Sequence, residues 1–218
     1  TQPAHQPNQY GRSLLREAYL SLRNTDMEFT IGRQLFIWGK ADGINPTDIL
    51  SPRDFTLLTP EDTDQRHGTF AAAIKYYADK ATISAFFLPE FRSDTLPLPA
   101  SGGISYVYSR PPRRNQYAVR MDVSRSDIEW SVSYFGGYDP VPDLSLTGTT
   151  PGGRIVGLTN HPMRNVGADF STSIKNWVVR GEAALSSPKD RESANFHGKK
   201  RQIFAIIGVE RAIGDGLT

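Results

Sequence analysis

Apolar and polar residues alternate with a period of two along several stretches of the chain. The pattern is clearest from Gln116 to Ser124, and a second run follows the short segment Arg125-Ser126-Asp127. On one side of the first run lie Tyr117, Val119, Met121 and Val123, and on the other lie Gln116, Arg120, Asp122 and Ser124. Because successive side chains of a β-strand point to opposite faces, this alternation predicts two strands joined in a hairpin.

The same pattern predicts about nine strands along the chain. They form four hairpins and a ninth strand on its own, at 13–23 with 27–38, 68–78 with 81–88, 115–124 with 127–138, 164–174 with 177–187, and 200–212. Connections within the hairpins are short, whereas those between them are long, about 39–67, 89–114, 139–163 and 188–199. Short turns at one end and long loops at the other are typical of an all-β, antiparallel up-and-down transmembrane β-barrel.

Composition agrees with this interpretation and removes several others. The chain is 38% hydrophobic with a mean hydropathy of −0.43, which suits a barrel because only every second strand residue faces lipid. No apolar run reaches the roughly 18–20 residues of a membrane-spanning helix. With 25 basic and 23 acidic residues spread along the chain, no nucleic-acid partner is expected. The absence of cysteine excludes disulfides and thiolate metal sites.

Strand direction suggests how the chain is organised. If the short turns face the periplasm, 13–23 and 200–212 both run from the outside inward, whereas bacterial barrels usually begin and end on the periplasmic side. We therefore expect residues 1–218 to be a single β-barrel segment, an interior portion of a larger barrel with a polar lead-in at 1–12. The alternative is a further strand inside the chain, for which 104–109 is the candidate.

Residues Gly32 to Asp48, continued by Ser51-Pro52-Arg53-Asp54, contain a Gly-Arg-Gln strand end, a Trp-Gly corner and a following Asn-Pro segment. This stretch resembles porin-like outer-membrane proteins of Gram-negative bacteria, in the alginate-export-like group. The runs 15–19, 166–170 and 177–184 are similar to other hairpins of that group. The resemblance implies a passive or export channel of the bacterial outer membrane, in contact with membrane lipid and lipopolysaccharide, and it does not specify the solute.

Two faces are expected for the barrel wall. The lipid face takes the alternating apolar residues, including Phe70, Ala72, Ile74, Tyr76, Ile83, Ala85, Phe87, Val166, Ala168, Phe170, Ile174, Trp177, Val179, Ala183, Leu185, Ile203, Ala205, Ile207 and Val209. The pore-lining set is Glu17, Arg33, Lys75, Arg120, Asp122, Glu129, Asp169, Arg180, Glu182 and Glu210. Charges are costly against lipid and tolerated in a water-filled lumen, so we expect a mixed-charge channel. The alternatives are that these charges only brace the wall, or that the chain is a soluble all-β domain.

Two arginines do not fit these faces. Arg33 shares the parity of the apolar residues Phe29 and Ile31, and we expect a bulge beside Gly32 to turn it inward. Arg16 shares the parity of Leu14 and Leu20, and the sequence offers no account of it.

The long connection at 39–67 is the strongest candidate for a functional element, because loops of this length inside compact domains are usually functional or disordered. Pro46, Pro52 and Pro60 stiffen it. We expect it to fold into the pore and to form a constriction with the charged residues Asp42, Asp48, Arg53 and Asp54. The alternative is an extracellular cap. Its carboxylates lack the spacing of a known calcium loop, so no metal is assigned.

The leading hypothesis is therefore a channel for small polar solutes or a polymer. The alternative is a structural barrel or scaffold subunit with partner proteins in a larger envelope complex. An enzyme is not expected, since His5, His67, His161 and His197 are isolated and the Ser186-to-Lys189 match to a Ser-x-x-Lys motif lacks its companion motifs. No phosphate-binding or dinucleotide-binding motif occurs, and no catalytic residue or cofactor is predicted.

Overall fold

A computed structural model describes residues 15–41, 44–99, 102–109, 115–189 and 200–211. In this part of the chain the fold is all-β, with one short 3₁₀ helix, η1 (Asp62–Gln65). The main sheet has nine strands in the order β1 (Ala18–Arg23), β2 (Met27–Gln34), β3 (Thr69–Tyr77), β4 (Ala81–Leu88), β6 (Gln116–Ser124), β7 (Ile128–Tyr138), β10 (Pro162–Ile174), β11 (Trp177–Pro188) and β12 (Gln202–Arg211). No helix among the described residues is long and apolar enough to cross a membrane.

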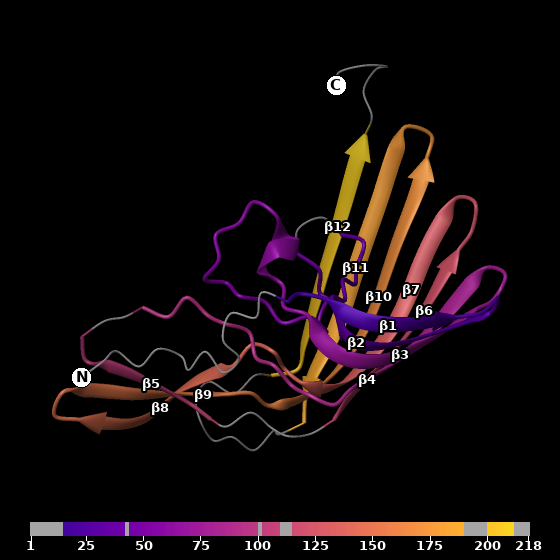
Figure 1. The fold of residues 1–218 in the computed structure, drawn as a ribbon. Helices are drawn as coiled ribbons and strands as arrows, with labels where there is room; N and C mark the ends of the chain where they lie inside the picture. Colours follow the sequence, from indigo (N-terminus) through magenta and orange to yellow (C-terminus); the bar gives the residue numbers. More distant parts are fainter. Residues whose placement is uncertain (1–14, 42–43, 100–101, 110–114, 190–199, 212–218) are drawn as a thin grey trace.

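Every pair of neighbouring strands in the main sheet is antiparallel. The four predicted hairpins and the ninth strand are confirmed, and so is the up-and-down order of the sheet. Figure 1 shows the hairpin turns together at one end and the long connections at the other. Among the described residues β1 and β12 are the two edges of an open sheet and do not pair with each other. The antiparallel meander is thus established, while barrel closure is not observed.

Three further strands form a second, smaller sheet. In the order β5-β9-β8, β5 (Ile104–Tyr108) pairs in parallel with β9 (Gly153–Thr159), which forms a hairpin with β8 (Asp143–Thr150). The candidate strand at 104–109 is therefore real, and the long connection at 139–163 contains two strands, β8 and β9, that the pattern did not predict. This sheet extends away from the long-loop end of the main sheet (Figure 1).

The two faces of the main sheet differ sharply in burial. Along β6, Tyr117 and Val119 are 54% and 47% exposed, whereas Ala118 and Arg120 are 1% and 7% exposed. The exposed side, here called the outer face, continues across the sheet with Leu20, Leu22, Phe29, Ile31, Ile74, Ile83, Phe87, Val132, Tyr134, Val166, Ile174, Trp177, Ile203, Ile207 and Val209. The alternation expected from the sequence is thus followed, with the apolar side open across the sheet and the polar side covered between the edge strands, since β1 and β12 are exposed on both faces.

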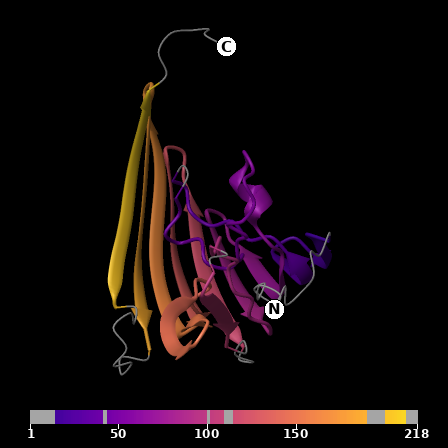
Figure 2. The same cartoon turned by 90° about the vertical axis from the view of Figure 1, so that its left-hand side faces the viewer.

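The covered side, here called the inner face, carries the segment that joins β2 to β3. The sheet is curved, and Figure 2 shows this segment, residues 35–68, on the inner side of the curve. We call it the inner loop. Small side chains on the inner face make room for it, because Ala71, Ala73 and Ala118 are buried beneath its aromatic residues.

Aromatic packing fixes the start of the inner loop on the sheet. The rings of Phe36 and Phe86 meet edge to face with centroids 5.2 Å apart, and Trp38 approaches Phe86 at 5.6 Å. Aromatic pairs in this geometry contribute about 0.5–1.5 kcal/mol beyond the area that they bury. The inner loop therefore has an apolar core of its own with β3, β4 and β6.

The structure corrects the expectation for Arg33 and explains Arg16. Pairing runs without a register shift through Gly32 and Arg33, so there is no bulge and Arg33 keeps the outer parity of Ile31. It lies at the end of β2, where its Nη1 donates to Gly68 O at 3.4 Å. Arg16 precedes β1 and forms an ion pair with Asp64 of η1 at 2.9 Å. The ion pair with Asp64 thus accounts for Arg16, which the strand pattern left unexplained.

Candidate functional site

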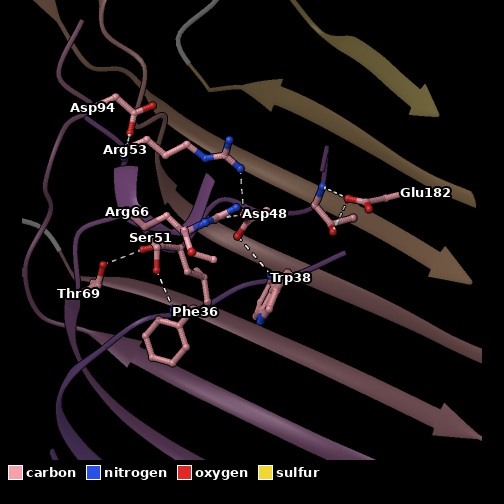
Figure 3. A network of polar contacts seen from close by, with 12 residues as sticks. Phe36, Trp38, Asp48, Ser51, Arg53, Arg66, Thr69, Asp94 and Glu182 are labelled. Carbon is pink, nitrogen blue, oxygen red and sulfur yellow. Dashed lines mark hydrogen bonds and ion pairs between the residues drawn. The ribbon is translucent and has the colours of Figure 1, made fainter. Parts of the chain in front are cut away.

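Glu182 of β11 anchors the tip of the inner loop to the far side of the curved sheet. Its Oε1 accepts hydrogen bonds from Thr47 N and Thr47 Oγ1, both at 2.7 Å. Its Oε2 accepts from Lys40 N at 3.2 Å and Ala41 N at 3.4 Å. Figure 3 shows the carboxylate facing the loop backbone. Glu182 is only 4% exposed, and bonds from four donors satisfy a charge that burial alone would make costly.

Two glycines allow this close approach. Gly39 has a φ of +95°, and a Cβ there would lie 2.3 Å from Glu182 Oε2. On β10, a Cβ at Gly167 would lie 2.4 Å from Thr47 Cγ2. Both positions therefore require glycine for the loop tip to reach the wall.

Asp48 lies at the centre of a second cluster, within the inner loop itself. Its side chain is 0% exposed and accepts from Trp38 N at 3.2 Å and Arg53 Nη2 at 3.1 Å, and it forms a further ion pair with Arg66 (Figure 3). Burial raises the pKa of the Asp48 carboxyl above its ordinary value, while the charges of Arg66 and Arg53 oppose that shift. The three donors match the ionised carboxylate, so Asp48 acts as a structural centre of the loop.

The other predicted constriction residues also contact the loop and its neighbours. Arg53 N donates to Asp94 Oδ1 at 2.8 Å, which ties the inner loop to the connection after β4. Asp54 accepts from Thr56 N at 3.0 Å and closes a local turn. Asp42 lies outside the described residues. Asp48, Arg53 and Asp54 thus hold the loop in shape, and their role in a constriction stays a prediction.

His67 lies beside Asp54, with 3.9 Å between Nε2 and Oδ2. Burial first, and then the nearby charge of Arg92, lower the pKa of His67 below its ordinary value, although Asp54 opposes the shift. His67 is therefore neutral at pH 7, and its contact with Asp54 is not an ion pair under that condition.

The wall beneath the inner loop holds an ion network centred on Arg120. Its Nε donates to Asp122 Oδ1 at 2.8 Å and its Nη2 pairs with Asp169 Oδ2 at 2.9 Å. The guanidinium also covers the Trp38 ring at 5.4 Å. Among the described residues, Arg120 Nη1 and Asp169 Oδ1 are buried without a hydrogen-bond partner. The predicted neighbours Arg120 and Asp122 are thus joined, and Asp169 is added from β10.

The remaining predicted wall charges lie on the inner side in smaller groups. Glu129 forms an ion pair with Lys40 of the inner loop, and Arg180 pairs with Glu210 at 3.2 Å. Glu17, just before β1, accepts from Leu35 N at 3.0 Å. Lys75 lies opposite Glu28 in the pairing of β2 with β3. These charges therefore form several local clusters instead of one ring.

Sequence reasoning missed several members of these clusters. Thr47, Lys40 and Arg66 bind the predicted charges, and Glu28 accepts from Tyr77 OH at 2.6 Å on the inner face. For Glu28 the signal was present, because it shares the parity of Thr30 within β2. For Thr47 there was none, since its partner is 135 residues away.

No metal centre is apparent within the described ranges, where no group of three or more His, Cys, Asp or Glu side chains is placed to hold an ion. Comparisons of the chain with protein-family models, with curated proteins and with solved structures found no match. The resemblance of residues 32–54 to porin-like proteins therefore stays a prediction.

Proposed function

We propose that this chain forms part of the wall of an outer-membrane β-barrel channel, and that its inner loop narrows a mixed-charge passage for small polar solutes. The observation that carries the proposal is the contrast between the two faces of one curved sheet. The outer face is apolar and exposed over all nine strands, and the inner face carries ion pairs and a polar loop. Lipid on one side and water on the other is the arrangement that suits both faces.

The position of the inner loop favours a constriction. It leaves the sheet at β2, binds Glu129 of β7 and Glu182 of β11, and returns to β3. A segment that crosses the inner face in this way reduces the cross-section of any passage behind the wall. Because the nearby wall charges are of both signs and mostly paired, we expect weak selectivity between cations and anions.

Removing the loop tip should enlarge the passage. Trp38 N lies 3.2 Å from Asp48 Oδ1, so residues 39–47 can be replaced by a Gly-Gly turn that keeps both ends in place. In planar lipid bilayers, we expect this variant to show stepwise single-channel conductance clearly above that of the parent chain. The passage widens because the contacts to β7 and β11 belong to the excised residues.

The matched control shortens the β8–β9 hairpin by replacing residues 148–154 with a tight turn. That hairpin belongs to the second sheet, so its loss should leave the conductance unchanged. Equal conductance of the parent and both variants would place the inner loop outside the pore. If none of the three proteins shows conductance in the bilayer, the channel proposal is rejected and the structural barrel is favoured.

A further inference from the structure

A polar hollow lies on the inner face between the inner loop and the strands β1, β2, β3, β4 and β6. It has a volume of about 410 Å³, within the roughly 300–1,000 Å³ that is usual for small-molecule sites. Its lining includes Tyr19, Glu28, Lys75, Ser84, Arg120 and Asp122. We call it the polar hollow.

Strand pairing places donors and acceptors of the hollow in one row. Glu28 lies opposite Lys75, and Lys75 lies opposite Ser84 on the next strand. Ser84 in turn lies opposite Arg120. Directly opposed residues have Cβ atoms about 4.5–5.5 Å apart, so the row alternates acceptor and donor at close spacing. With acidic and basic groups interleaved, no single charge sign dominates the site.

The two cations of this row differ in how they are used. Arg120 binds Asp122 through Nε and Asp169 through Nη2, and its Nη1 is buried, so it shapes the wall of the hollow. Lys75 Nζ makes no hydrogen bond or ion pair within the described part of the chain, although its charge interacts electrostatically with the nearby Glu28 carboxylate. A hydroxyl group both accepts and donates, so it can bind a cation and a neighbouring carboxylate at once.

An aromatic ring is available beside these polar groups. Tyr19 of β1 lines the hollow and is 55% exposed, which leaves ring surface uncovered. Such a ring offers an apolar face to a ligand and a hydroxyl at its tip. The combination of the ring, the interleaved charges and the unused Lys75 ammonium fits a compact molecule with many hydroxyl groups and C–H faces.

We propose that the polar hollow binds an uncharged polyhydroxylated solute of the sugar class. The inference deepens the channel proposal by naming the solute, and it rests on that proposal for any role in passage. Binding itself requires only the inner face, and it can be measured on the full chain in detergent micelles or lipid vesicles.

The test compares glucose with glucuronate and glucosamine, which share a ring and differ in charge, by calorimetric titration of the full chain at pH 7. We expect glucose to give the tightest saturable binding of the three. Tyr19→Ser should weaken glucose binding about fivefold or more, since it removes the exposed ring. Lys75→Met, which removes the ammonium donor and keeps an unbranched apolar side chain, should weaken glucose binding as well.

Tyr76→Ser is the matched control, because Tyr76 adjoins Lys75 and is similarly exposed but lies on the outer face. It should leave glucose binding unchanged. Tighter binding of glucuronate or glucosamine than of glucose would overturn the proposal. Equal losses of glucose affinity in Tyr19→Ser and Tyr76→Ser would overturn it too, and so would the absence of saturable glucose binding. Glucose binding without channel conductance would reject the channel proposal and keep the inference of a sugar site. Channel conductance without glucose binding would keep the channel proposal and reject the sugar site.

Discussion

Glu182→Gln is expected to release the tip of the inner loop from the wall. The amide nitrogen cannot accept a hydrogen bond, so the two donors at Lys40 and Ala41 lose their acceptor. Hydrogen bonds to a charged group contribute about 1.5–3 kcal/mol each, so local opening should become easier by about 3 kcal/mol. Amide hydrogen exchange over residues 39–47 should then accelerate roughly 100-fold.

Glu210→Gln is the control for this change. Glu210 is also a strand glutamate paired with an inner-face group, but its side chain is 67% exposed and its ion pair is with Arg180 of the sheet. Its substitution should leave exchange in 39–47 unaltered. If Glu182→Gln also leaves that exchange unaltered, the loop tip is held by its other contacts and Glu182 is not its anchor.

Asp48→Ala is expected to cause the largest loss of stability. The change removes the carboxylate that pairs with Arg66, whose side chain is 1% exposed. Removing one partner of a buried ion pair typically costs about 3–5 kcal/mol. We expect the free energy of unfolding, measured by urea titration of the chain in vesicles, to fall by about that amount.

The comparison variant is Asp64→Ala, which removes the exposed ion pair between the same loop and Arg16. Exposed pairs contribute about 0–1 kcal/mol, so a small change is expected. A loss of similar size in both variants would mean that the burial of Asp48 has no special energetic role. The double variant Asp48→Ala, Arg66→Met should recover part of the loss, because the buried charge of Arg66 is then removed together with that of Asp48.

The sequence predicted most of the main sheet because its strands have one covered and one open face. Period-two alternation then identifies both the strand and its face, as in β6 and β7. The strands β8 and β9 were missed because Gly148, Gly152, Gly153 and Gly157 interrupt the alternation and Pro151 sits in their turn. Such residues are read as loop signals, although here they belong to a twisted hairpin with a register shift.

The sequence predicted where the inner loop lies, but it did not predict which residues the loop contacts. Length and proline content indicated a loop folded against the inner face, and the loop does lie there. The constriction role of Asp48 and Arg53 stays a prediction, and their ion pair with each other was not predicted because it depends on how the loop folds back on itself. Pairing of Thr47 with Glu182 depends on the curvature of the sheet, which brings distant strands to face the same loop, and curvature leaves no local signal in the sequence.

Whether the outer face meets lipid is tested most directly with two single-cysteine variants, Val119→Cys and Asp122→Cys, in lipid vesicles. The natural chain has no cysteine, so each variant reports one position on β6, the first on the outer face and the second on the inner face. If the outer face meets lipid and the inner face meets water, a water-soluble maleimide should label Asp122→Cys much faster than Val119→Cys, and the two rates should converge after unfolding in detergent. Equal or faster labelling of the Val119→Cys variant in vesicles would show that the outer face is in water and would contradict the assignment of the two faces.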